Sequence, residues 1–553
     1  MLNKFFADIG KKLATPSTVD GGPRDMNSYI YRISPSVSEI NLSTELLKKS
    51  FEAAVRVGKA CGPDNITAKD LKLHPNCSIT GLEKVVRCSL ISGKFPTQWK
   101  ISKVTAIHKK GSKTDCSNFR PISLLSVPSK IVEHLICSQM VEHLTEHNLQ
   151  TEHQWGLRSH RSTEDALLHM TEKWRRALDS GLVVGVLFID FRKAFDTVSH
   201  QILLKKLSAC GISGNFLEYV ENYLTNRKQY TVVNGMSSTL ADVKFGVPQG
   251  SHIGPTSFSV NVNDMCDCID CDMDQFADDS TAHTIGSNVD KVLADLSTSA
   301  NQIETYTKRN SVTIHPEKCE ILILSRKKFI GPLRNVEIGG RNIEIVKSSK
   351  CLGVILDKEL KWTEHVTTAC KRFSQKVKKL YQMRSMPKTT LLSIYNQGIL
   401  PSVLYAIVIW GNCSPSLMLT IEKVHIRAAR FVFRLKKSIP DNEVLQTVNW
   451  KQITHYYKRT LANKAFKIYN NLTSPLLAEL MKKSNFRATR NAFKIDVPSF
   501  KYVDFKKSFQ YRIAIIWNNI PNKIREKSYE SFKNDLKKNP TVLDKIQSNR
   551  KSS

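Results

Sequence analysis

The sequence lacks an apolar run long enough to cross a membrane. Its longest such run extends from Ile399 to Trp410, is interrupted by Pro401, and falls short of the roughly 20 residues that a spanning helix requires. The N-terminus also lacks the apolar core and the small-residue cleavage site of a secretory signal. We therefore expect an intracellular protein, in the nucleus or the cytoplasm, that has no membrane partner.

Internal repeats, long low-complexity tracts and paired cysteine motifs are also missing from the sequence. Thirteen cysteines are scattered over 553 residues, an odd number that argues for reduced thiols rather than a disulfide framework. The densest group, Cys266, Cys268 and Cys271, has no second pair that would complete a zinc site. We interpret this group as an exposed connector.

Acidic residues are few relative to basic ones. The chain has 50 Asp and Glu residues against 82 Lys and Arg residues, a formal net charge of +32. Such a surplus favours a polyanionic partner, through long-range steering and counterion release. In all other respects the amino-acid composition is typical of a folded protein. The length of the chain predicts several domains. Nucleic acid is the expected partner.

Two adjacent carboxylates occur in the stretch Gln275-Phe-Ala-Asp-Asp-Ser-Thr281. The residues before Asp278 and Asp279 predict a short buried strand that turns at its acidic tip. Two like charges so close do not both stay ionised unaided, and a divalent cation with oxygen ligands, such as Mg²⁺, relieves their repulsion. The alternative is an Asp pair that caps a helix or solvates a turn, and the pair alone favours that alternative.

A third carboxylate follows a second predicted strand. The run from Val183 to Ile189 is continuously apolar and of strand length, which predicts a buried strand, and Asp190 comes directly after it. If Asp190 and Asp278 converge, they would hold two divalent ions and support in-line phosphoryl transfer. In isolation, Asp190 would equally well cap the helix expected just after it.

Basic residues recur in two places where phosphate would need them. Lys109 lies in a basic turn after a predicted strand, and Arg120 lies in the next segment. Arg427, Arg430 and Arg434 recur at spacings of three and four, which predicts one basic face of a helix that contacts nucleic acid. Solvated surface is the alternative for both. The turn alone favours that alternative, whereas the net charge favours phosphate contact for the helix.

Six motifs occur in a specific order along the chain: Asn118-Phe-Arg-Pro-Ile-Ser-Leu-Leu125, Gln154-Trp-Gly-Leu-Arg158, Asp190-Phe-Arg-Lys-Ala-Phe-Asp196, Gly246-Val-Pro-Gln-Gly-Ser251 with Gly254-Pro255, Phe276-Ala-Asp-Asp279 and Cys351-Leu-Gly-Val354. In this order and spacing the chain resembles the reverse transcriptases of non-LTR (LINE-like) retrotransposons. The resemblance extends from Gly58 to Leu435 and continues more weakly to about Lys538. It implies an RNA-directed DNA polymerase that extends the 3′-hydroxyl of a primer with dNTPs.

The resemblance also implies a role for each matching residue. Asp190 and Asp278 match the ligands of two Mg²⁺ ions, with Mn²⁺ as an alternative cofactor, and Asp279 matches the acid that assists them. Lys318 is similar to the general acid for the pyrophosphate leaving group, and Phe195 to the residue that excludes a 2′-hydroxyl. The implied nucleotide-binding positions are Lys109, Arg120, Lys193, Ala194, Phe195, Gln249 and Gly250, and the implied primer grip is Leu352 and Gly353.

The fold implied is an α+β right-hand polymerase with fingers, a ferredoxin-like palm and a helical thumb. We expect a linker and N-terminal extension at 1–57, with a loose lead-in to about Pro35. The reverse transcriptase domain (fingers and palm) is expected at 58–356, the thumb at 357–440 and a basic helical segment at 441–553. Full-length relatives carry an endonuclease before the polymerase, and residues 1–22 resemble the connector after it, so we expect a truncated element.

Two other functions stay open at this point. A catalytically silent RNA-binding remnant would explain the truncated start and His252, which stands where the family usually has an apolar residue. A metal-dependent nuclease is less consistent, because Phe195, Gln249 and Gly250 would have no role in hydrolysis. For the polymerase, the expected partners are an RNA template, a DNA primer or target, and dNTPs.

Overall fold

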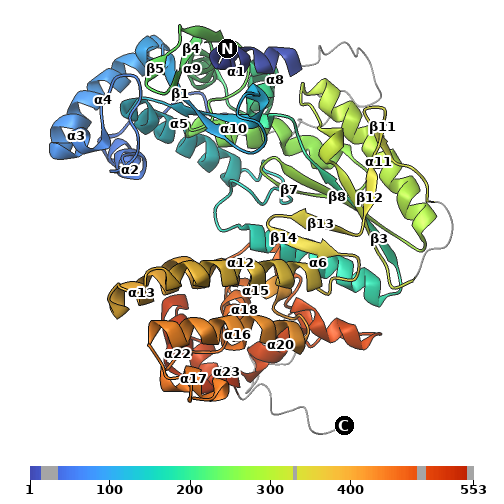
Figure 1. Ribbon diagram of the computed structural model, residues 1–553. Helices are drawn as coiled ribbons and strands as arrows, with labels where there is room; N and C mark the ends of the chain where they lie inside the picture. Colours follow the sequence, from blue (N-terminus) through green and yellow to red (C-terminus); the bar gives the residue numbers. More distant parts are fainter. Residues whose placement is uncertain (14–34, 328–332, 483–492, 545–553) are drawn as a thin grey trace.

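The computed structural model describes residues 1–13, 35–327, 333–482 and 493–544, which form a mixed α/β structure. Figure 1 shows two sheets with their helices in the upper half, a body of helices in the lower half, and the strands β13 and β14 between them. Within these ranges, no helix combines the length and the apolar character that crossing a bilayer demands. The expected combination of helices and sheets is confirmed.

Five strands form the central sheet in the order β12-β9-β3-β8-β7. Strand β3 lies in its middle, pairs antiparallel with β8 and β9, and is the predicted apolar run. A strand covered on both faces needs apolar side chains on both, which explains its unbroken hydrophobic sequence. The bounds are β3 (Val183–Ile189), β7 (Asp272–Phe276), β8 (Asp279–Gly286), β9 (Glu320–Leu324) and β12 (Glu344–Val346).

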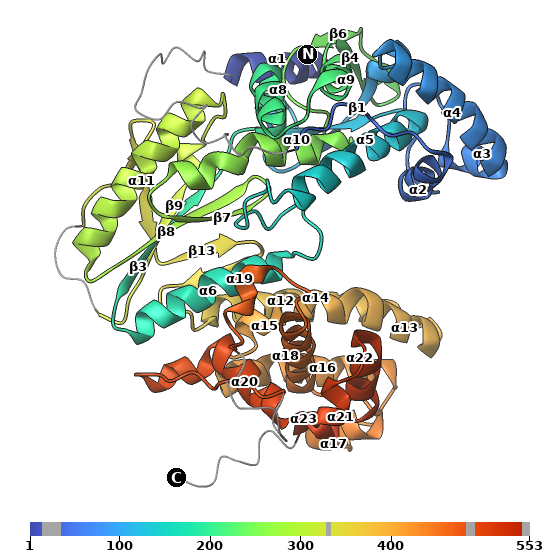
Figure 2. The same ribbon diagram turned by 180° about the vertical axis from the view of Figure 1, so that it is seen from behind.

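Helices α11 (Val289–Arg309) and α6 (Thr163–Asp179) cover the two faces of the central sheet, as Figures 1 and 2 show. Helix α11 approaches so closely at Gly185 that a Cβ atom there would lie 2.3 Å from the Val292 side chain. On the other face, Trp174 of α6 packs edge-on against His283 of β8, with 5.7 Å between the ring centroids. Both faces are therefore buried.

A second sheet has the order β2-β1-β4-β5, with β6 paired to β4. Its strands are β1 (Ile101–His108), β2 (Phe119–Leu124), β4 (Arg227–Val233), β5 (Met236–Ser237) and β6 (Ala241–Val243). The helices of this half are α2 (Thr44–Ala54), α3 (Ala68–Leu73), α4 (Pro75–Ser92), α5 (Val127–Glu146), α7 (Ala194–Thr197), α8 (His200–Ala209), α9 (Gly214–Leu224) and α10 (Ile253–Val262). Short 3₁₀ turns are η2 (Thr97–Lys100), η3 (Cys116–Asn118), η4 (Asn263–Cys268) and η5 (Pro316–Lys318).

The N-terminal helix α1 (Leu2–Leu13) corrects the expectation of a loose lead-in. Phe6 and Ile9 are buried, and the Asn3 side chain donates a hydrogen bond to the Thr239 carbonyl at 2.8 Å. At Gly10 a Cβ atom would lie 2.3 Å from the Asp196 carbonyl oxygen. The helical spacing of the apolar residues explains this packing. The rest of the expected lead-in, residues 14–34, lies outside the described residues.

The expectation of an exposed cysteine connector is also wrong. Cys266, Cys268 and Cys271 are partly buried against the core beneath α11, because their neighbours in sequence Met265 and Ile269 are core residues. None of the thirteen cysteines, all of which lie within the described residues, forms a disulfide.

Two hairpins follow β9 in the chain. The first, β10 (Glu337–Ile338) with β11 (Arg341–Asn342), lies beside α11 in the upper half, where the Gly339 N–H donates to Glu304 at 2.9 Å. The second, β13 (Ser348–Cys351) with β14 (Val354–Asp357), leads into the lower half. Its helices are α12 (Thr363–Tyr381), α13 (Lys388–Ile394), η6 (Tyr395–Ile399), α14 (Leu400–Leu404), α15 (Ile407–Trp410), α16 (Pro415–Val432), α17 (Asp441–Thr447), α18 (Ile453–Tyr469), α19 (Pro475–Ala478), η7 (Val503–Lys507), α20 (Phe509–Asn519), α21 (Asn522–Arg525), α22 (Tyr529–Lys538) and α23 (Thr541–Asp544).

One hydrophobic core continues from the central sheet through α6 into this helical body. The buried Glu172 of α6 accepts the backbone N–H groups of Phe509 at 2.8 Å and Gln510 at 2.9 Å, which begin α20. The buried Lys464 of α18 pairs with Asp165 of α6 at 2.8 Å. Helices α18 and α20 are therefore bonded directly to a helix of the central sheet.

Glu422 of α16 makes the stability of the helical body depend on pH. Its Oε2 atom accepts the Ile453 N–H at 2.9 Å, whereas Oε1 has no hydrogen-bond partner among the described residues. Burial raises the pKa of this carboxyl from 4.5 to about 7. The unfolded chain loses this proton at lower pH than the folded chain, so stability falls as the pH rises from 4.5 to about 7.

We expect Glu422→Gln, which resembles the protonated acid, to match the parent in stability at pH 5 and to exceed it at pH 8. The expected gain is on the order of 2–3 kcal/mol. Urea unfolding of both proteins at the two pH values measures it. An equal difference between the proteins at both pH values would contradict the raised pKa.

Candidate functional site

Three aspartates meet at one edge of the central sheet. Asp190 directly follows β3, Asp278 lies in the turn between β7 and β8, and Asp279 begins β8. The register pairs Ile189 with Ser280, so Asp190 comes level with Asp279 on the neighbouring strand. Burial raises the pKa of Asp279, and the negative charges of Asp278 and Asp190 raise it further. The structure therefore brings together the carboxylates that the sequence singles out.

The alternative in which Asp190 caps the following helix is wrong. Helix α7 begins at Ala194 and its N-cap position is Lys193, which has a left-handed backbone at φ 49°. The Asp190 carboxylate instead pairs with Lys318, whose Nζ lies 2.9 Å from Oδ1. Backbone bonds position Lys318: the His315 N–H donates to the Asp190 carbonyl at 2.8 Å, and the Lys318 N–H donates to the His315 carbonyl at 2.9 Å.

Gln154 holds the acidic turn in place. Its Oε1 atom accepts the N–H of Ala277 at 3.0 Å and the N–H of Gly156 at 2.9 Å. Ala277 has a left-handed φ of 57°, a conformation costly for a residue with a Cβ, and the neighbouring Trp155 N–H bonds the Gln275 carbonyl at 2.7 Å. Sequence reasoning used this motif for the resemblance but gave Gln154 no role. Only the fold reveals that it touches the turn.

Four cations surround the approach to the acidic edge. Burial lowers the pKa of Lys109, and the nearby charges of Arg120 and Lys318 lower it further. Burial likewise lowers the pKa of Lys193, whose Nζ donates to the Phe119 carbonyl at 3.0 Å. The predicted phosphate-binding residues therefore lie close enough to repel one another. Such a concentration of positive charge suits a polyphosphate.

Phe195 and the loop at Gln249 and Gly250 lie beside these cations. The Phe195 ring stacks on Phe258, with 4.9 Å between the centroids and 24° between the planes, which fixes its orientation. The Gln249 amide donates to both carboxylate oxygens of Asp196, at 2.9 and 3.0 Å. Burial raises the pKa of Asp196 to about 6, although the Gln249 hydrogen bond opposes this. Sequence reasoning gave Asp196 no role.

Gly250 and Ala194 both occupy tightly packed positions beside the loop. Gly250 has φ 126°, and a Cβ atom there would lie 2.6 Å from the Ser123 carbonyl oxygen. The Ser123 N–H in turn donates to the Gln249 carbonyl at 2.8 Å, which ties the loop to β2. Ala194 is buried at the start of α7. A larger residue would be strained at Gly250.

Leu352 and Gly353 form the turn between β13 and β14, with φ values of 45° and 88°. The Tyr405 hydroxyl donates to the Leu352 carbonyl at 2.7 Å. A groove between this hairpin and the helices α12 and α14 begins at Gly353. Its described lining contains no carboxylate and five cations, Lys350, Arg372, Lys376, Lys378 and Lys379.

The prediction that Arg427, Arg430 and Arg434 share one basic face of a helix is wrong. Helix α16 ends at Val432, and Arg434 lies beyond it with a left-handed φ of 52°. Arg430 is half-buried and pairs with Asp441 at 2.7 Å. Arg427 is exposed on the helix. The pattern failed because spacing alone reveals neither the end of a helix nor a partner from the next helix.

The donor set at the acidic edge suits a hard divalent cation. Asp278 and Asp279 are exposed, and the Asp190 side chain is 37% exposed, so carboxylate oxygens are open to solvent. In addition to burial, the charges of Asp278 and Asp190 raise the pKa of Asp279, and a cation would relieve this repulsion. Oxygen-only donors are typical of sites for hard ions rather than for zinc.

Comparison with known proteins shows which proteins have sequences similar to the part of the chain that contains this edge. Residues 107–356 match the family described as reverse transcriptase (RNA-dependent DNA polymerase). The chain is 30% identical over 386 residues to the "Probable RNA-directed DNA polymerase from transposon X-element" of Drosophila melanogaster, covering 68% of this chain and 42% of that protein. It is 28% identical over 387 residues to the "Probable RNA-directed DNA polymerase from transposon BS" of the same species, covering 68% and 43%.

A third relative is the "RNA-directed DNA polymerase from mobile element jockey" of Drosophila melanogaster. It is 27% identical over 421 residues, which is 73% of this chain and 45% of the relative. The chain thus spans less than half the length of these relatives. Residues 107–356, which match the family, contain the acidic edge, the four cations and the β13–β14 hairpin except for its last residue.

Proposed function

Since residues 107–356 belong to the reverse transcriptase family and resemble the polymerases of non-LTR retrotransposons, we propose that this chain is an RNA-directed DNA polymerase. One observation carries the proposal: Asp190, Asp278 and Asp279 converge at a sheet edge whose approach is lined by Lys109, Arg120, Lys193 and Lys318. Carboxylates that bind metal beside cations that bind phosphate are what phosphoryl transfer requires.

Asp190 and Asp278 would hold two Mg²⁺ ions, and Asp279 would assist them. When bound, the ions would activate the primer 3′-hydroxyl and stabilise the leaving oxygen. Lys109, Arg120 and Lys193 would bind the triphosphate of the incoming nucleotide. Lys318, whose ammonium already lies at Asp190, would give its proton to the leaving pyrophosphate.

The fingers, palm and thumb are part of the same proposal. The central sheet with α6 and α11 would be a ferredoxin-like palm, and the sheet of β1, β2 and β4 with α2 to α5 would belong to the fingers. Together they would form the reverse transcriptase domain at 58–356, after the extension at 1–57. Residues 357–440 would form the thumb, and the helices of 441–553 would extend it.

An RNA template and a DNA primer would lie in the basic groove beside Gly353. The groove has five cations and no carboxylate in its described lining, and it starts at the hairpin proposed as primer grip. Of the predicted arginines, Arg427 and Arg434 remain exposed and would contact the backbone, whereas Arg430 is paired. Gln249 and Gly250 would lie against the template base and the nucleotide.

Extension of a labelled DNA primer on an RNA template tests the proposal. With Mg²⁺ and dNTPs, the purified chain should yield extended products whose length follows the template. Salt-sensitive binding of the RNA without any extension, under conditions in which a control polymerase works, would overturn the proposal and leave a silent RNA-binding protein. His252 does not itself favour that outcome, because its N–H donates to the buried Glu133 at 2.9 Å and its ring packs edge-on against His134.

Phe195→Val is expected to admit ribonucleotides. The stacking on Phe258 keeps the Phe195 ring from moving aside, so a 2′-hydroxyl would clash with it. Relief of a clash worth about 1–3 kcal/mol predicts kcat/KM for ribonucleotides about 5- to 150-fold above the parent. Steady-state incorporation of dNTPs and rNTPs measures this. Phe500→Val, at an exposed phenylalanine, is the control and should discriminate as the parent does. Unchanged discrimination in Phe195→Val would contradict the assigned role.

A further inference from the structure

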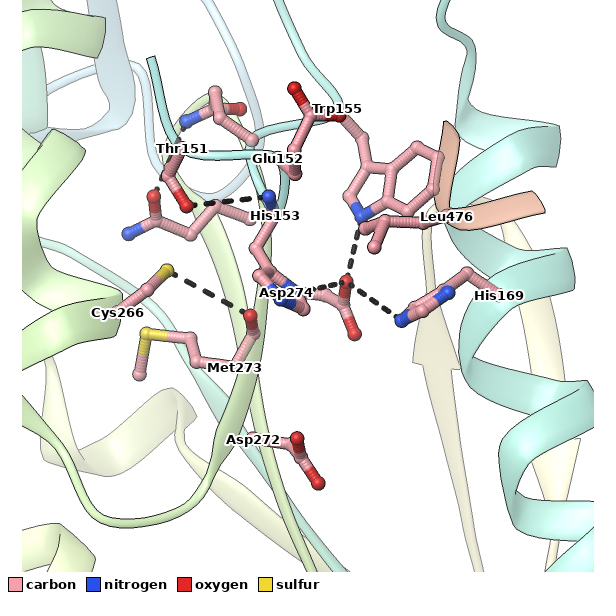
Figure 3. A network of polar contacts seen from close by, with 12 residues as sticks. Thr151, Glu152, His153, Trp155, His169, Cys266, Asp272, Met273, Asp274 and Leu476 are labelled. Atoms are coloured by element: carbon pink, nitrogen blue, oxygen red, sulfur yellow. Dashed lines mark hydrogen bonds and ion pairs between the residues drawn. The ribbon is translucent and has the colours of Figure 1, made fainter. Parts of the chain in front are cut away.

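Three potential metal ligands converge below the acidic turn. They are His153 in the segment before Trp155, His169 on α6, and Asp274 on β7, and each offers an atom within 4.8 Å of the others. The Asp274 Oδ1 atom lies 3.3 Å from His153 Nδ1 and 3.8 Å from His169 Nε2. Figure 3 shows both imidazoles directed at this carboxylate from different sides.

The polar atoms of this cluster are incompletely satisfied. Asp274 is 3% exposed, and its Oδ2 atom has no hydrogen-bond partner among the described residues. The same holds for His169 Nε2, which faces the carboxylate. Asp274 Oδ1 accepts one good hydrogen bond, from Trp155 Nε1 at 2.7 Å. A buried carboxylate oxygen and a buried imidazole nitrogen are rarely left without partners, so each needs an explanation.

Neighbouring charges do not supply the missing partner. Lys173 is held by Asp272 at 2.7 Å. His283 lies 3.7 Å from Asp272 and its charge is felt by Asp274, but neither of its ring nitrogens has a hydrogen-bond partner among the described residues. The Cys266 thiol bonds the Met273 carbonyl, away from the two imidazoles (Figure 3).

The two imidazoles differ in how readily they donate a lone pair. Burial lowers the pKa of His169, which favours its neutral form, whereas the hydrogen bond to Asp274 raises the pKa of His153. A metal ion would take the place of the His153 proton that faces Asp274. The His153 side chain is 32% exposed, which gives an ion a path from solvent to the buried carboxylate. Two imidazoles and a carboxylate form a donor set typical of zinc and neighbouring transition metals, with a fourth position left for water.

We propose that His153 Nδ1, His169 Nε2 and the Asp274 carboxylate form a binding site for a divalent transition-metal ion of the zinc class. The site is separate from the acidic edge, and nothing in the proposed polymerase chemistry uses its residues. Imidazole ligands favour zinc over Mg²⁺, so the two sites would select different ions. The ion would replace the hydrogen bond between His153 and Asp274 and satisfy the orphaned atoms.

The position of the site suggests what the ion does. It would join α6, β7 and the segment that carries Gln154, and Gln154 holds Ala277 in the acidic turn. Asp274 also lies on the strand that leads directly into that turn. The ion would therefore be structural, and would keep the turn and its anchor in register.

Metal content of the purified full-length chain tests the site. The protein is equilibrated with Zn²⁺ in excess Mg²⁺, which occupies the acidic edge, and bound zinc is then counted by elemental analysis. His169→Gln and His153→Asn should each bind one equivalent less than the parent. The control is His160→Asn, because His160 is exposed and has a left-handed φ of 61° that asparagine tolerates. It should bind as the parent does.

Two further readouts separate this site from zinc held by the thirteen free cysteines and from a folding defect. Co²⁺ in the site should give visible d–d absorption that is lost in His169→Gln, without loss of any thiolate charge-transfer band. Zn²⁺ should raise the melting temperature of the parent but not that of His169→Gln. Equal zinc content in the parent and both variants, or no effect of Zn²⁺ on parent melting, would overturn the proposal.

Discussion

Asp278→Asn is expected to reduce primer extension by at least about a thousandfold. The amide keeps the size of the side chain but removes the charge that would hold a divalent ion at the acidic edge. Loss of several kcal/mol of charge stabilisation, at 1.4 kcal/mol for each tenfold, gives this magnitude. Because Asp278 is exposed in a turn, the melting temperature should change little. Single-turnover extension at saturating Mg²⁺ and dNTP measures the effect.

A matched control lies at the opposite end of the same sheet. Asp290 is exposed in the first turn of α11, which follows the far end of β8. Asp290→Asn removes one carboxylate charge from the same chain and should extend primers at nearly the parental rate. If Asp278→Asn kept activity within tenfold of this control, the acidic turn would not be the catalytic centre.

Gly156→Ala is expected to lower kcat by about a hundredfold, without preventing folding. A Cβ atom at this position would lie 2.5 Å from the Ala277 nitrogen and 3.0 Å from the Phe276 carbonyl carbon. These are backbone atoms of the acidic turn, so the methyl group is accommodated only if the turn moves. A displacement of about 1 Å at a catalytic group costs about a hundredfold in rate. Rapid-quench incorporation of a single nucleotide measures kcat for this step.

Gly81→Ala is the matched control for that substitution. Gly81 lies within α4, and a Cβ atom there would meet nothing within 4 Å. Alanine is the better helix former by about 1 kcal/mol, so this variant should be slightly more stable and fully active. Parental activity in Gly156→Ala would show that the turn tolerates displacement and would remove the role assigned to its close packing.

The bounds of β3, the strand that ends just before Asp190, could be predicted to the residue, because a strand buried on both faces has a continuous apolar sequence. The pairing of β3 with β8, which brings Asp190 level with Asp279, could not be read from either strand. It was expected only because the order of the motifs resembled a known family. Local patterns therefore predicted the elements, and the resemblance predicted their convergence.

Contacts between distant segments account for what the sequence did not reveal. His153 and Asp274 are 121 positions apart, and neither has a neighbour in sequence that marks a metal site. Arg430 looked like part of an exposed face because its partner Asp441 lies on the next helix. In each case the role of the residue depends on a partner that is distant in the sequence and close only in the folded chain.

The bonds between α6 and the helical body limit where this chain can be divided. A fragment ending near residue 440 would lose both the α20 N–H groups that Glu172 accepts and the Lys464 ammonium that Asp165 binds. Two buried carboxylates of α6 would then lose these partners, and Asp165 would keep only its hydrogen bond from the Ser162 hydroxyl. The C-terminal helices consequently cover α6 where it packs on the central sheet. The solubility of a shortened protein should therefore be measured before its activity.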